Sequence, residues 1–461
     1  MVFIGLNEAQ YLKKHLAEVK HVTLNPNGSD VLRIHMIPPK RRFNKDVPCA
    51  VVVNGQDIVP LNLSWAILLS AFMDAIAPYD GKGMQPGDWE SIVAETIRSV
   101  NTVYRGVKED RLRDDLWTII STLADISQGK KPQADIGQIS IGEYAKHMKA
   151  PHRMDLMISS MTRGESWNCN QKCLHCYAAG QTLASAQELS TREWTRIIDR
   201  CREAGIPQIT FTGGEPTLRG DLAELVDHSK WFITRLNTNG VLLTKDLCAR
   251  LHEASLDSVQ ITLYAAEAEA HNALVGADNW DKTVAGIQNA LEASLSVSVN
   301  TPLCALNRDY LKTLGFVRGL GVRYLTCSGL IIAGSAKSAE STGTQLSAEA
   351  LETILGDAYR YCAANGMELS FTSPGWVPEN RLRDIGFTSI PTCGACLSNM
   401  AVSPDGRVVP CQSWLSADAL GSMLTDPWEK IWDSPACRKI REESARMAHR
   451  CPLRVQPEVN S

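Results

Sequence analysis

Cys169-Asn-Gln-Lys-Cys173-Leu-His-Cys176-Tyr177 places three cysteines and an aromatic residue on one short stretch of chain. Three thiolates at this spacing can each ligate one iron of a [4Fe–4S] cubane, which leaves the fourth iron without a cysteine. Most electron-transfer cubanes have four cysteine ligands. A cluster with only three protein ligands therefore offers an iron to which a small molecule can bind.

A second motif, Gly213-Gly214-Glu215-Pro216, directly follows the apolar run 208–211. The cysteine spacing and this glycine motif together resemble the radical S-adenosylmethionine (SAM) enzymes, whose glycine motif follows the second barrel strand. The resemblance implies that Cys169, Cys173 and Cys176 hold a [4Fe–4S] cluster and that SAM binds its open iron. It further implies reductive cleavage of SAM to a 5′-deoxyadenosyl radical, which takes a hydrogen atom from the substrate.

The resemblance also implies which other residues contact SAM. Gly213 and Gly214 lack side chains, so the backbone can approach the SAM amino group, and Glu215 supplies an acceptor near it. Pro216 stiffens the turn, and the remaining positions face the adenine, ribose or carboxylate. The full expected set is Tyr177, Gly213, Gly214, Glu215, Pro216, Asn239 and Thr262.

A zinc site is the alternative for the cysteine stretch, because His175 lies between the last two cysteines. That alternative describes a non-catalytic zinc or iron–sulfur protein and predicts no cleavage of SAM. It accounts neither for the glycine motif nor for the repeating pattern described next.

Strand and helix patterns alternate from residue 151 to residue 385, which predicts an α/β fold with parallel strands. Six units fit the partial (β/α)6 TIM-type barrel of the family that the motifs resemble. Barrel enzymes place their chemistry at the C-terminal ends of the strands, where the cysteines, the glycine motif and Asn237-Thr238-Asn239-Gly240 all fall. The expected strands are 156–160, 208–211, 231–236, 258–263, 297–300 and 323–327.

Residues 48–130 predict a hairpin around Asn54-Gly55 followed by three helices. This order resembles the winged-helix-like α+β domain (PqqD-like) with which peptide-modifying enzymes recognise leader peptides. A leader would then add as a strand to the edge of the sheet. A generic helical cap domain is the alternative. Residues 1–47 are expected to form a separate N-terminal segment, and residues 131–150 a linker.

Residues 386–461 contain a third cysteine group, in which Cys393-Gly-Ala-Cys396 precedes Pro404-Asp405-Gly406 and Cys411. This spacing resembles the SPASM/twitch domain, and a turn at Gly406 would bring Cys411 back towards Cys393. A full SPASM domain ends with several close cysteines, whereas this chain has only Cys451. The resemblance implies one auxiliary [4Fe–4S] cluster, with Cys437 as the spare cysteine; structural zinc is the alternative. The expected ligands are Cys393, Cys396, Cys411 and Cys451.

Composition and hydrophobic patterning limit the partners and the location that the sequence suggests. The 461 residues are 44% apolar and 21% charged with a net charge of −4, which gives no reason to expect a nucleic-acid partner. No apolar run reaches membrane-spanning length, and the N-terminus lacks the apolar core of a signal peptide. Fourteen cysteines in such a chain favour metal chemistry in the reducing cytoplasm.

Together the patterns predict a radical SAM maturase of ribosomally synthesised peptides that makes oxidative thioether or carbon–carbon crosslinks. The expected partners are a precursor peptide, bound through its leader, and an electron donor such as flavodoxin or ferredoxin. Epimerisation is an alternative that needs a thiol hydrogen donor, for which Cys304 or Cys327 is available. A sulfatase-maturase-like or haem-pathway oxidase is another alternative.

Overall fold

The computed structural model divides the chain into two units, Met1–Ala150 and Pro151–Ser461, and each is described by itself. No helix in the described part of the chain is long and apolar enough to span a membrane. The structure describes residues 6–24, 32–38, 49–54, 57–79, 84–128, 130, 132, 134, 144–145, 148–339, 342–415, 418–446 and 450–454.

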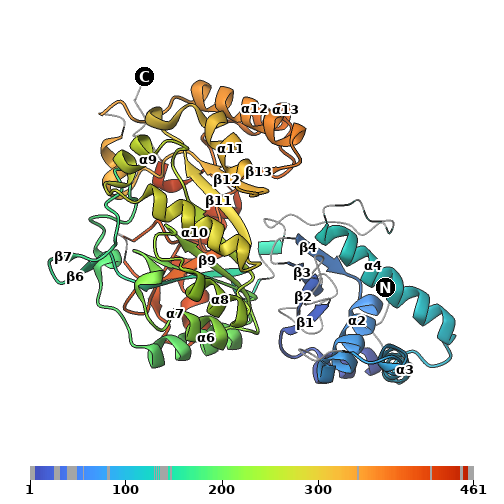
Figure 1. Ribbon diagram of the computed structural model, residues 1–461. Helices are drawn as coiled ribbons and strands as arrows, with labels where there is room; N and C mark the ends of the chain where they lie inside the picture. The colour runs from blue at the N-terminus through green and yellow to red at the C-terminus, as the bar shows by residue number, and fades with distance from the viewer. Residues whose placement is uncertain are drawn as a thin grey trace. The chain divides into compact units, whose positions relative to one another are not determined.

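Among its described residues, the first unit combines an antiparallel four-stranded sheet with the helices α1 to α4 (Figure 1). The predicted hairpin and its three following helices are confirmed, and the sheet order is β1-β2-β3-β4. The elements are α1 (Leu6–His15), β1 (Lys20–Leu24), β2 (Leu32–Ile37), β3 (Cys49–Val53), β4 (Asp57–Leu61), α2 (Leu63–Ile76), α3 (Asp88–Asn101) and α4 (Glu109–Ser127).

Residues 1–47 do not form a separate segment, because β1 and β2 extend the sheet that begins with the predicted hairpin. His21 of β1 lies opposite His35 of β2, and Ile34 of β2 lies opposite Val53 of β3. Strand β1 was not predicted because it is short and only Val22 and Leu24 of its five residues are apolar and pack on the core. The first unit therefore begins before residue 48. Most of the expected linker 131–150 lies outside the described residues.

Helix α2 is the centre of the first unit and is apolar on nearly all sides. Its N-cap is Asn62, whose side chain accepts a hydrogen bond from Trp65 N (2.9 Å). A helix that is apolar all round is stable only when it is buried, and most of its residues are: Ala66, Ile67, Leu68, Leu69, Ser70, Ala71, Phe72, Met73 and Ile76.

The second unit contains all six predicted barrel strands, and they pair in parallel in the expected order. Leu156 of the first strand, for example, lies opposite Phe211 of the second, and Phe211 lies opposite Leu236 of the third. This parallel sheet is the partial barrel that the sequence predicts. The strands are β5 (Arg153–Ser159), β8 (Gln208–Gly213), β9 (Ile233–Thr238), β10 (Ser258–Thr262), β11 (Ser296–Pro302) and β12 (Tyr324–Ser328).

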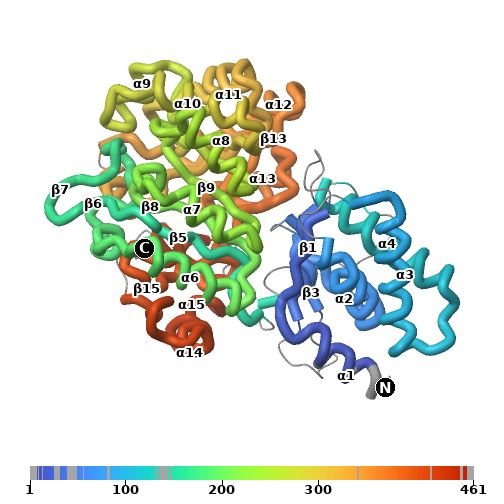
Figure 2. The backbone as a smooth tube through the Cα atoms, turned by 60° about the horizontal axis from the view of Figure 1, so that its bottom comes forward, coloured from blue at the N-terminus to red at the C-terminus, as the bar shows by residue number. Residues whose placement is uncertain are grey.

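Helices follow the strands in turn and succeed one another along the sheet (Figures 1 and 2). Helix α6 has clear sequence signals at both ends: Ser190 and Glu193 form a capping box, and Gly205 ends the helix with a φ of +78°. The helices are α6 (Thr191–Ala204), α7 (Leu222–His228), α8 (Lys245–Glu253), α9 (Ala268–Val275), α10 (Trp280–Glu292), α11 (Tyr310–Gly319), α12 (Ala348–Ala364) and α13 (Glu379–Ile385).

Four strands outside the six extend the sheet at both ends. At one end β13 (Glu368–Phe371) pairs in parallel with β12. At the other end β14 (Asn399–Val402) pairs in parallel with β5 and continues into β15 (Arg407–Val409) and β16 (Gly421–Ser422). The segment expected as a separate domain, 386–461, thus shares one sheet with the barrel, and two helices complete it: α14 (Trp428–Trp432) and α15 (Pro435–Arg446).

Candidate functional site

The two faces of the barrel sheet differ in chemistry. Cys327 of β12 is fully buried and lies close to Tyr310 of α11 and Cys362 of α12, so its face is the one that the helices cover. Alternate strand residues point to opposite faces, and Thr326 accordingly lies on the other face. There Thr326 donates to Asn300 Oδ1 (2.9 Å) and accepts from Gln260 Nε2 (3.1 Å). Along β10, β11 and β12 the barrel interior is therefore polar and half-exposed.

The cysteine stretch leaves the C-terminal end of β5 through a short hairpin, β6 (Thr162–Arg163) and β7 (Ser166–Trp167). It is then held against three segments that are distant in sequence. Because both ends and the middle of the loop are fixed, its three sulfurs are positioned by the barrel itself. The contacts are Cys169 Sγ to Gly214 O (3.3 Å), Lys172 N to Val275 O (2.9 Å) and Ser335 N to Cys176 O (2.9 Å).

The three thiols are buried and close enough to influence one another. Burial raises the pKa of Cys169 to about 12, with smaller contributions from Glu215 and Cys176, and burial likewise raises the pKa of Cys173 and Cys176. Cys176 and Cys169 raise the Cys173 pKa further. Without a bound metal, such thiols stay protonated. Iron binds the thiolate form, so a bound cationic iron centre favours deprotonation of the three cysteines.

The arrangement fits a cubane better than a single zinc ion. A cubane takes one thiolate per iron, so its ligands do not meet at one point. Within the described part of the chain, no three His, Cys, Asp or Glu side chains converge as they would around one metal ion. His175, the expected fourth zinc ligand, has Nε2 at 2.8 Å from Thr344 Oγ1 instead.

The two glycines of the 213–216 motif are required by strand packing. A Cβ on Gly213, whose φ is +135°, would lie 2.3 Å from Ser159 O, and a Cβ on Gly214 would lie 2.6 Å from Ser160 O. Both oxygens belong to the backbone at the end of β5, so neither can move out of the way. The sequence analysis attributed these glycines to the approach of SAM alone; the structure adds the contact with β5 as a second reason.

Glu215 is buried, and its carboxylate is surrounded by donors from the protein. Oε1 accepts from Thr217 N (2.9 Å), Thr217 Oγ1 (2.5 Å) and Thr238 Oγ1 (2.6 Å), and Oε2 accepts from Asn239 N (2.8 Å). Burial raises the pKa of Glu215, while these donors act in the opposite direction. Glu215 therefore joins the end of β8 to the end of β9, in addition to the acceptor role that the sequence predicts for it.

We expect the Glu215→Gln substitution to destabilise the protein by roughly 1–3 kcal/mol, the cost of an unsatisfied buried polar group. A carboxamide has one oxygen, so its NH2 group must face one of the donors that now point at Glu215. Thermal or denaturant unfolding measures the change. Glu165→Gln, in the exposed turn between β6 and β7, is the matched control, and equal stability of the two variants would contradict the expectation.

The other expected SAM-contact residues lie around the same end of the barrel. Asn239 follows β9 and donates from Nδ2 to Asn170 Oδ1 (2.6 Å), which ties the strand to the cysteine loop. Pro216 begins the short 3-10 helix η4 (Pro216–Leu218). Thr262 ends β10 opposite Asn300, on the polar face of the sheet.

Tyr177 is buried beside the cysteine loop. Burial raises its pKa, with further contributions from Cys176, Asp155 and Cys411, while Thr212 acts in the opposite direction. The phenol therefore lies between the cysteine loop and Cys411, against the interior face of β5 and β8. Its expected contact with the adenine of SAM stays a prediction.

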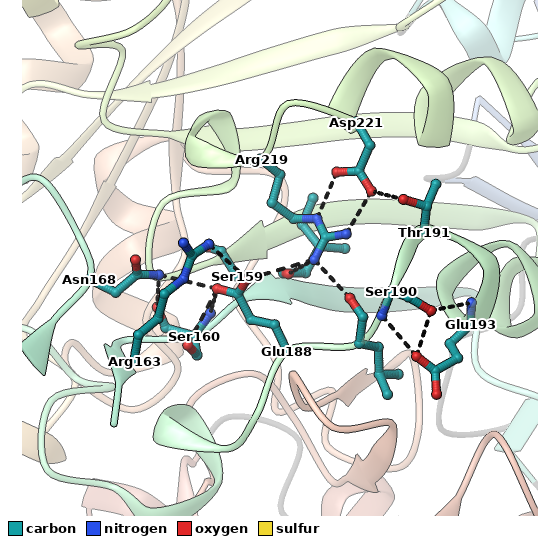
Figure 3. A network of polar contacts seen from close by, with 12 residues as sticks. Ser159, Ser160, Arg163, Asn168, Glu188, Ser190, Thr191, Glu193, Arg219 and Asp221 are labelled. Atoms are coloured by element: carbon teal, nitrogen blue, oxygen red, sulfur yellow. Dashed lines mark hydrogen bonds and ion pairs between the residues drawn. The ribbon is translucent and has the colours of Figure 1, made fainter. Parts of the chain in front are cut away.

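A polar network missed by the sequence analysis fixes the approach to Cys169 (Figure 3). Glu188 Oε1 accepts from Ser160 N (2.9 Å) and from Asn168 Nδ2 (3.1 Å), and Oε2 accepts from Arg163 Nη2 (3.0 Å). Arg219, just after η4, lies 3.8 Å from Glu188 Oε2. The Glu188 carboxylate thus connects Asn168, which precedes Cys169, with Arg219, which follows the glycine motif.

We expect Glu188→Ala to lower stability by roughly 1–3 kcal/mol and to lower the iron content of the reconstituted protein, because it leaves Ser160 N–H without its acceptor and removes one of the two acceptors of Asn168 Nδ2. Glu188→Gln keeps one acceptor oxygen and should fall between Glu188→Ala and the wild type. Calorimetry and iron analysis measure both effects. Wild-type iron content in the Ala variant would show that the network does not position the cysteine loop.

The auxiliary cysteines come together around the β14–β15 hairpin, whose turn is where the sequence predicted it. Cys396 N donates to Pro410 O (3.1 Å), which brings the 393–396 loop beside Cys411. Cys393 and Cys451 are close enough to Cys411 to raise its pKa, after the larger effect of burial. Cys437, expected as the spare cysteine, lies close enough to Cys396 for the two thiols to shift each other's pKa. Five cysteines therefore gather here, and any four suffice for one cubane.

Comparison with known proteins identifies two domains in the second unit. The family model "Radical SAM superfamily" matches residues 168–316, and the model "Iron-sulfur cluster-binding domain" (SPASM) matches residues 393–452. An AdoMet-dependent heme synthase of Oleidesulfovibrio alaskensis is 28% identical over 58% of this chain and 72% of that protein. A probable GTP 3′,8-cyclase of Methanopyrus kandleri is 34% identical over 34% of this chain and 52% of that protein.

Solved structures with the same fold include two peptide-associated enzymes. Streptococcus suis SuiB bound to S-adenosylmethionine has a TM-score of 0.57 at 13% identity, covering 86% of this chain and 87% of SuiB. The protein anSMEcpe with bound AdoMet has a TM-score of 0.50 at 18% identity, covering 63% of this chain and 83% of that one. At these identities the likeness shows the fold.

The second unit therefore contains a radical SAM domain and a SPASM domain, and the chain is an enzyme. Its cofactors are a [4Fe–4S] cluster with SAM in the radical SAM domain and auxiliary iron–sulfur in the SPASM domain. Three gathered thiols on one loop and five around the β14–β15 hairpin fit these two groups.

Proposed function

We propose that this chain is a maturase of ribosomally synthesised peptides that makes an oxidative thioether or carbon–carbon crosslink. The observation that carries the proposal is the first unit. It places the meander β2-β3-β4 and the helices α2, α3 and α4 before a radical SAM barrel. That order resembles a PqqD-like leader-recognition domain, which a radical SAM enzyme of small metabolites does not need.

The edge strand β4 is the expected docking site for the leader. It is an outer strand of the sheet, and Pro60 within it is tolerated because an edge strand has one side without ladder partners. An extended peptide can add to such an edge through main-chain hydrogen bonds. SuiB, whose fold covers most of this chain, has been solved bound to its precursor peptide SuiA. We infer the same kind of partner here, in a reducing cytoplasm that keeps the thiols available for iron.

Residue roles follow from the site geometry. When bound, the cluster and SAM supply a 5′-deoxyadenosyl radical that abstracts hydrogen from the substrate. Cys169, Cys173 and Cys176 hold that cluster, and Gly213 to Pro216 with Asn239 and Thr262 form the wall against which SAM lies. Tyr177 separates this site from the auxiliary cysteines. The polar interior face, with Gln260, Asn300 and Thr326, receives the segment of peptide to be modified. Flavodoxin or ferredoxin is the proposed electron donor.

Epimerisation fits the geometry less well than crosslinking. It requires a thiol that returns a hydrogen atom to the substrate radical. Cys327 points to the helix-covered face, away from the polar interior. Cys304 is fully buried in the same apolar cluster as Tyr264, against which Cys173 packs. Neither thiol is presented to the barrel interior.

A haem-pathway reaction is the second candidate, and the curated relatives favour it. Besides the enzyme described above, an AdoMet-dependent heme synthase of Methanosarcina barkeri is 27% identical over 59% of this chain and 82% of that protein. Such a reaction needs no leader peptide, so the role of the first unit separates the two candidates.

The test supplies the holoenzyme with a candidate precursor peptide, chosen from short reading frames beside its gene, with the same peptide lacking its leader, or with a porphyrin substrate. Modification of the full precursor, with at least a tenfold loss of rate for the leaderless peptide, supports the proposal. Turnover of the porphyrin without modification of either peptide would establish the haem-pathway reaction instead.

A further inference from the structure

Helix α15 buries an unusual face. A surface helix normally buries an apolar stripe, but the buried residues of α15 are Cys437, Arg441 and Ser444. Their spacing of four and three residues puts them on one side of the helix. A thiol, a guanidinium and a hydroxyl therefore face the protein interior together.

This face meets the loop that carries the first two auxiliary cysteines. Ser444 Oγ donates to Ala395 O (2.8 Å) and lies 3.6 Å from Cys393 Sγ. Two turns earlier on the helix, Cys437 lies close enough to Cys396 for the two thiols to shift each other's pKa. Cys396 has a φ of +52°, which is unfavourable for any residue with a side chain and is typical of functional sites when the fold maintains it. Helix α15 and the 393–396 loop therefore pack against each other through residues that lie beside cysteine sulfurs.

Arg441 brings a buried positive charge to the same place. Its side chain is 8% exposed, and Nη1 donates to Cys437 Sγ (3.5 Å) and to Trp432 O (3.2 Å). Its guanidinium lies 3.9 Å from the centre of the Trp432 ring, a cation–π contact. Arginine keeps its charge in proteins, so a permanent cation is held beside the auxiliary sulfurs.

We propose that Arg441 is a positioning residue that raises the reduction potential of the auxiliary cluster and so makes it an electron acceptor. One-electron reduction makes a thiolate-ligated cluster more negative. A buried cation and hydrogen bonds to the sulfurs stabilise the reduced form more than the oxidised form. The inference rests on the proposed oxidative function, in which the substrate radical gives up one electron as its new bond forms.

The test is a redox titration, followed by electron paramagnetic resonance, of the full-length chain with Cys169, Cys173 and Cys176 changed to Ala. That protein holds only the auxiliary cluster. Adding Arg441→Gln should shift the ratio of reduced to oxidised cluster at least tenfold towards the oxidised form, a fall of about 59 mV for a one-electron couple. Arg441→Lys should recover part of the fall. Arg438→Gln, on the exposed side of α15, should leave the potential unchanged.

An unchanged potential in an Arg441→Gln protein that keeps its iron would overturn the inference. If Arg441→Gln does not keep its iron, Arg441→Lys tests the same point: a smaller fall in potential supports the inference, and no fall overturns it. Failure of the parent protein to assemble any auxiliary cluster would overturn the cluster assignment and the inference with it. None of these measurements uses the peptide. A failure of the proposed peptide substrate can therefore be distinguished from a failure of the Arg441 inference.

Discussion

Replacing any one of Cys169, Cys173 or Cys176 by Ala is expected to abolish formation of 5′-deoxyadenosine from SAM. Each thiol is held by a different part of the barrel end, so no neighbouring cysteine can take its place. Loss of one thiolate leaves two iron sites without a protein ligand in the cubane, which has one ligand per iron. Activity should fall at least a thousandfold, and iron should fall from about eight to about four per chain if one auxiliary cubane remains.

The matched control is Cys248→Ala, which removes a fully buried thiol from the outer helix α8. It should retain its iron and its cleavage of SAM, apart from a small loss of stability. Chromatography of 5′-deoxyadenosine together with iron analysis measures both variants. A Cys173→Ala protein that cleaves SAM at the wild-type rate would contradict the assignment of the three ligands.

The second large effect is expected at the auxiliary site, where Cys411→Ala should separate cleavage of SAM from product formation. Cys411 lies close to Cys393 and Cys451, and burial raises its pKa to about 12, so it needs a bound cation to act as a thiolate. A crosslink removes two hydrogens from the peptide, and the deoxyadenosyl group carries away only one. The variant should still form 5′-deoxyadenosine but should yield at least a hundredfold less crosslinked peptide.

The control for this prediction is Cys362→Ala in α12, a buried thiol away from both cysteine groups. Mass spectrometry of the peptide and chromatography of 5′-deoxyadenosine are performed on the same samples. Equal loss of both products in Cys411→Ala would mean that the auxiliary site supports the fold of the barrel and has no separate role in oxidation.

Sequence reasoning predicted most of the barrel because its signals are local. The six strands are short apolar runs, and α6 has both a capping box at Ser190 and a terminal Gly205. Motif spacing predicted the cysteine loop for the same reason, since all three thiols lie within a few residues. The hairpin turn at Gly406 is another local signal, and β14 and β15 confirm it.

The parts that sequence reasoning missed depend on contacts between distant residues. Glu188 looks like an ordinary loop carboxylate, and its role appears only when Asn168 and Arg219 are placed beside it. The clash that excludes a side chain at Gly214 comes from Ser160, the residue that follows β5. Pairing of β14 with β5 and the burial of Arg441 likewise arise from tertiary packing.

The most direct test of the account is the mass of the precursor peptide after anaerobic reaction with the reconstituted enzyme, SAM and a reductant. We predict that the full precursor loses two hydrogens while 5′-deoxyadenosine forms. A precursor of unchanged mass in ordinary water that gains deuterium in heavy water, with 5′-deoxyadenosine formed, would contradict crosslinking and establish epimerisation.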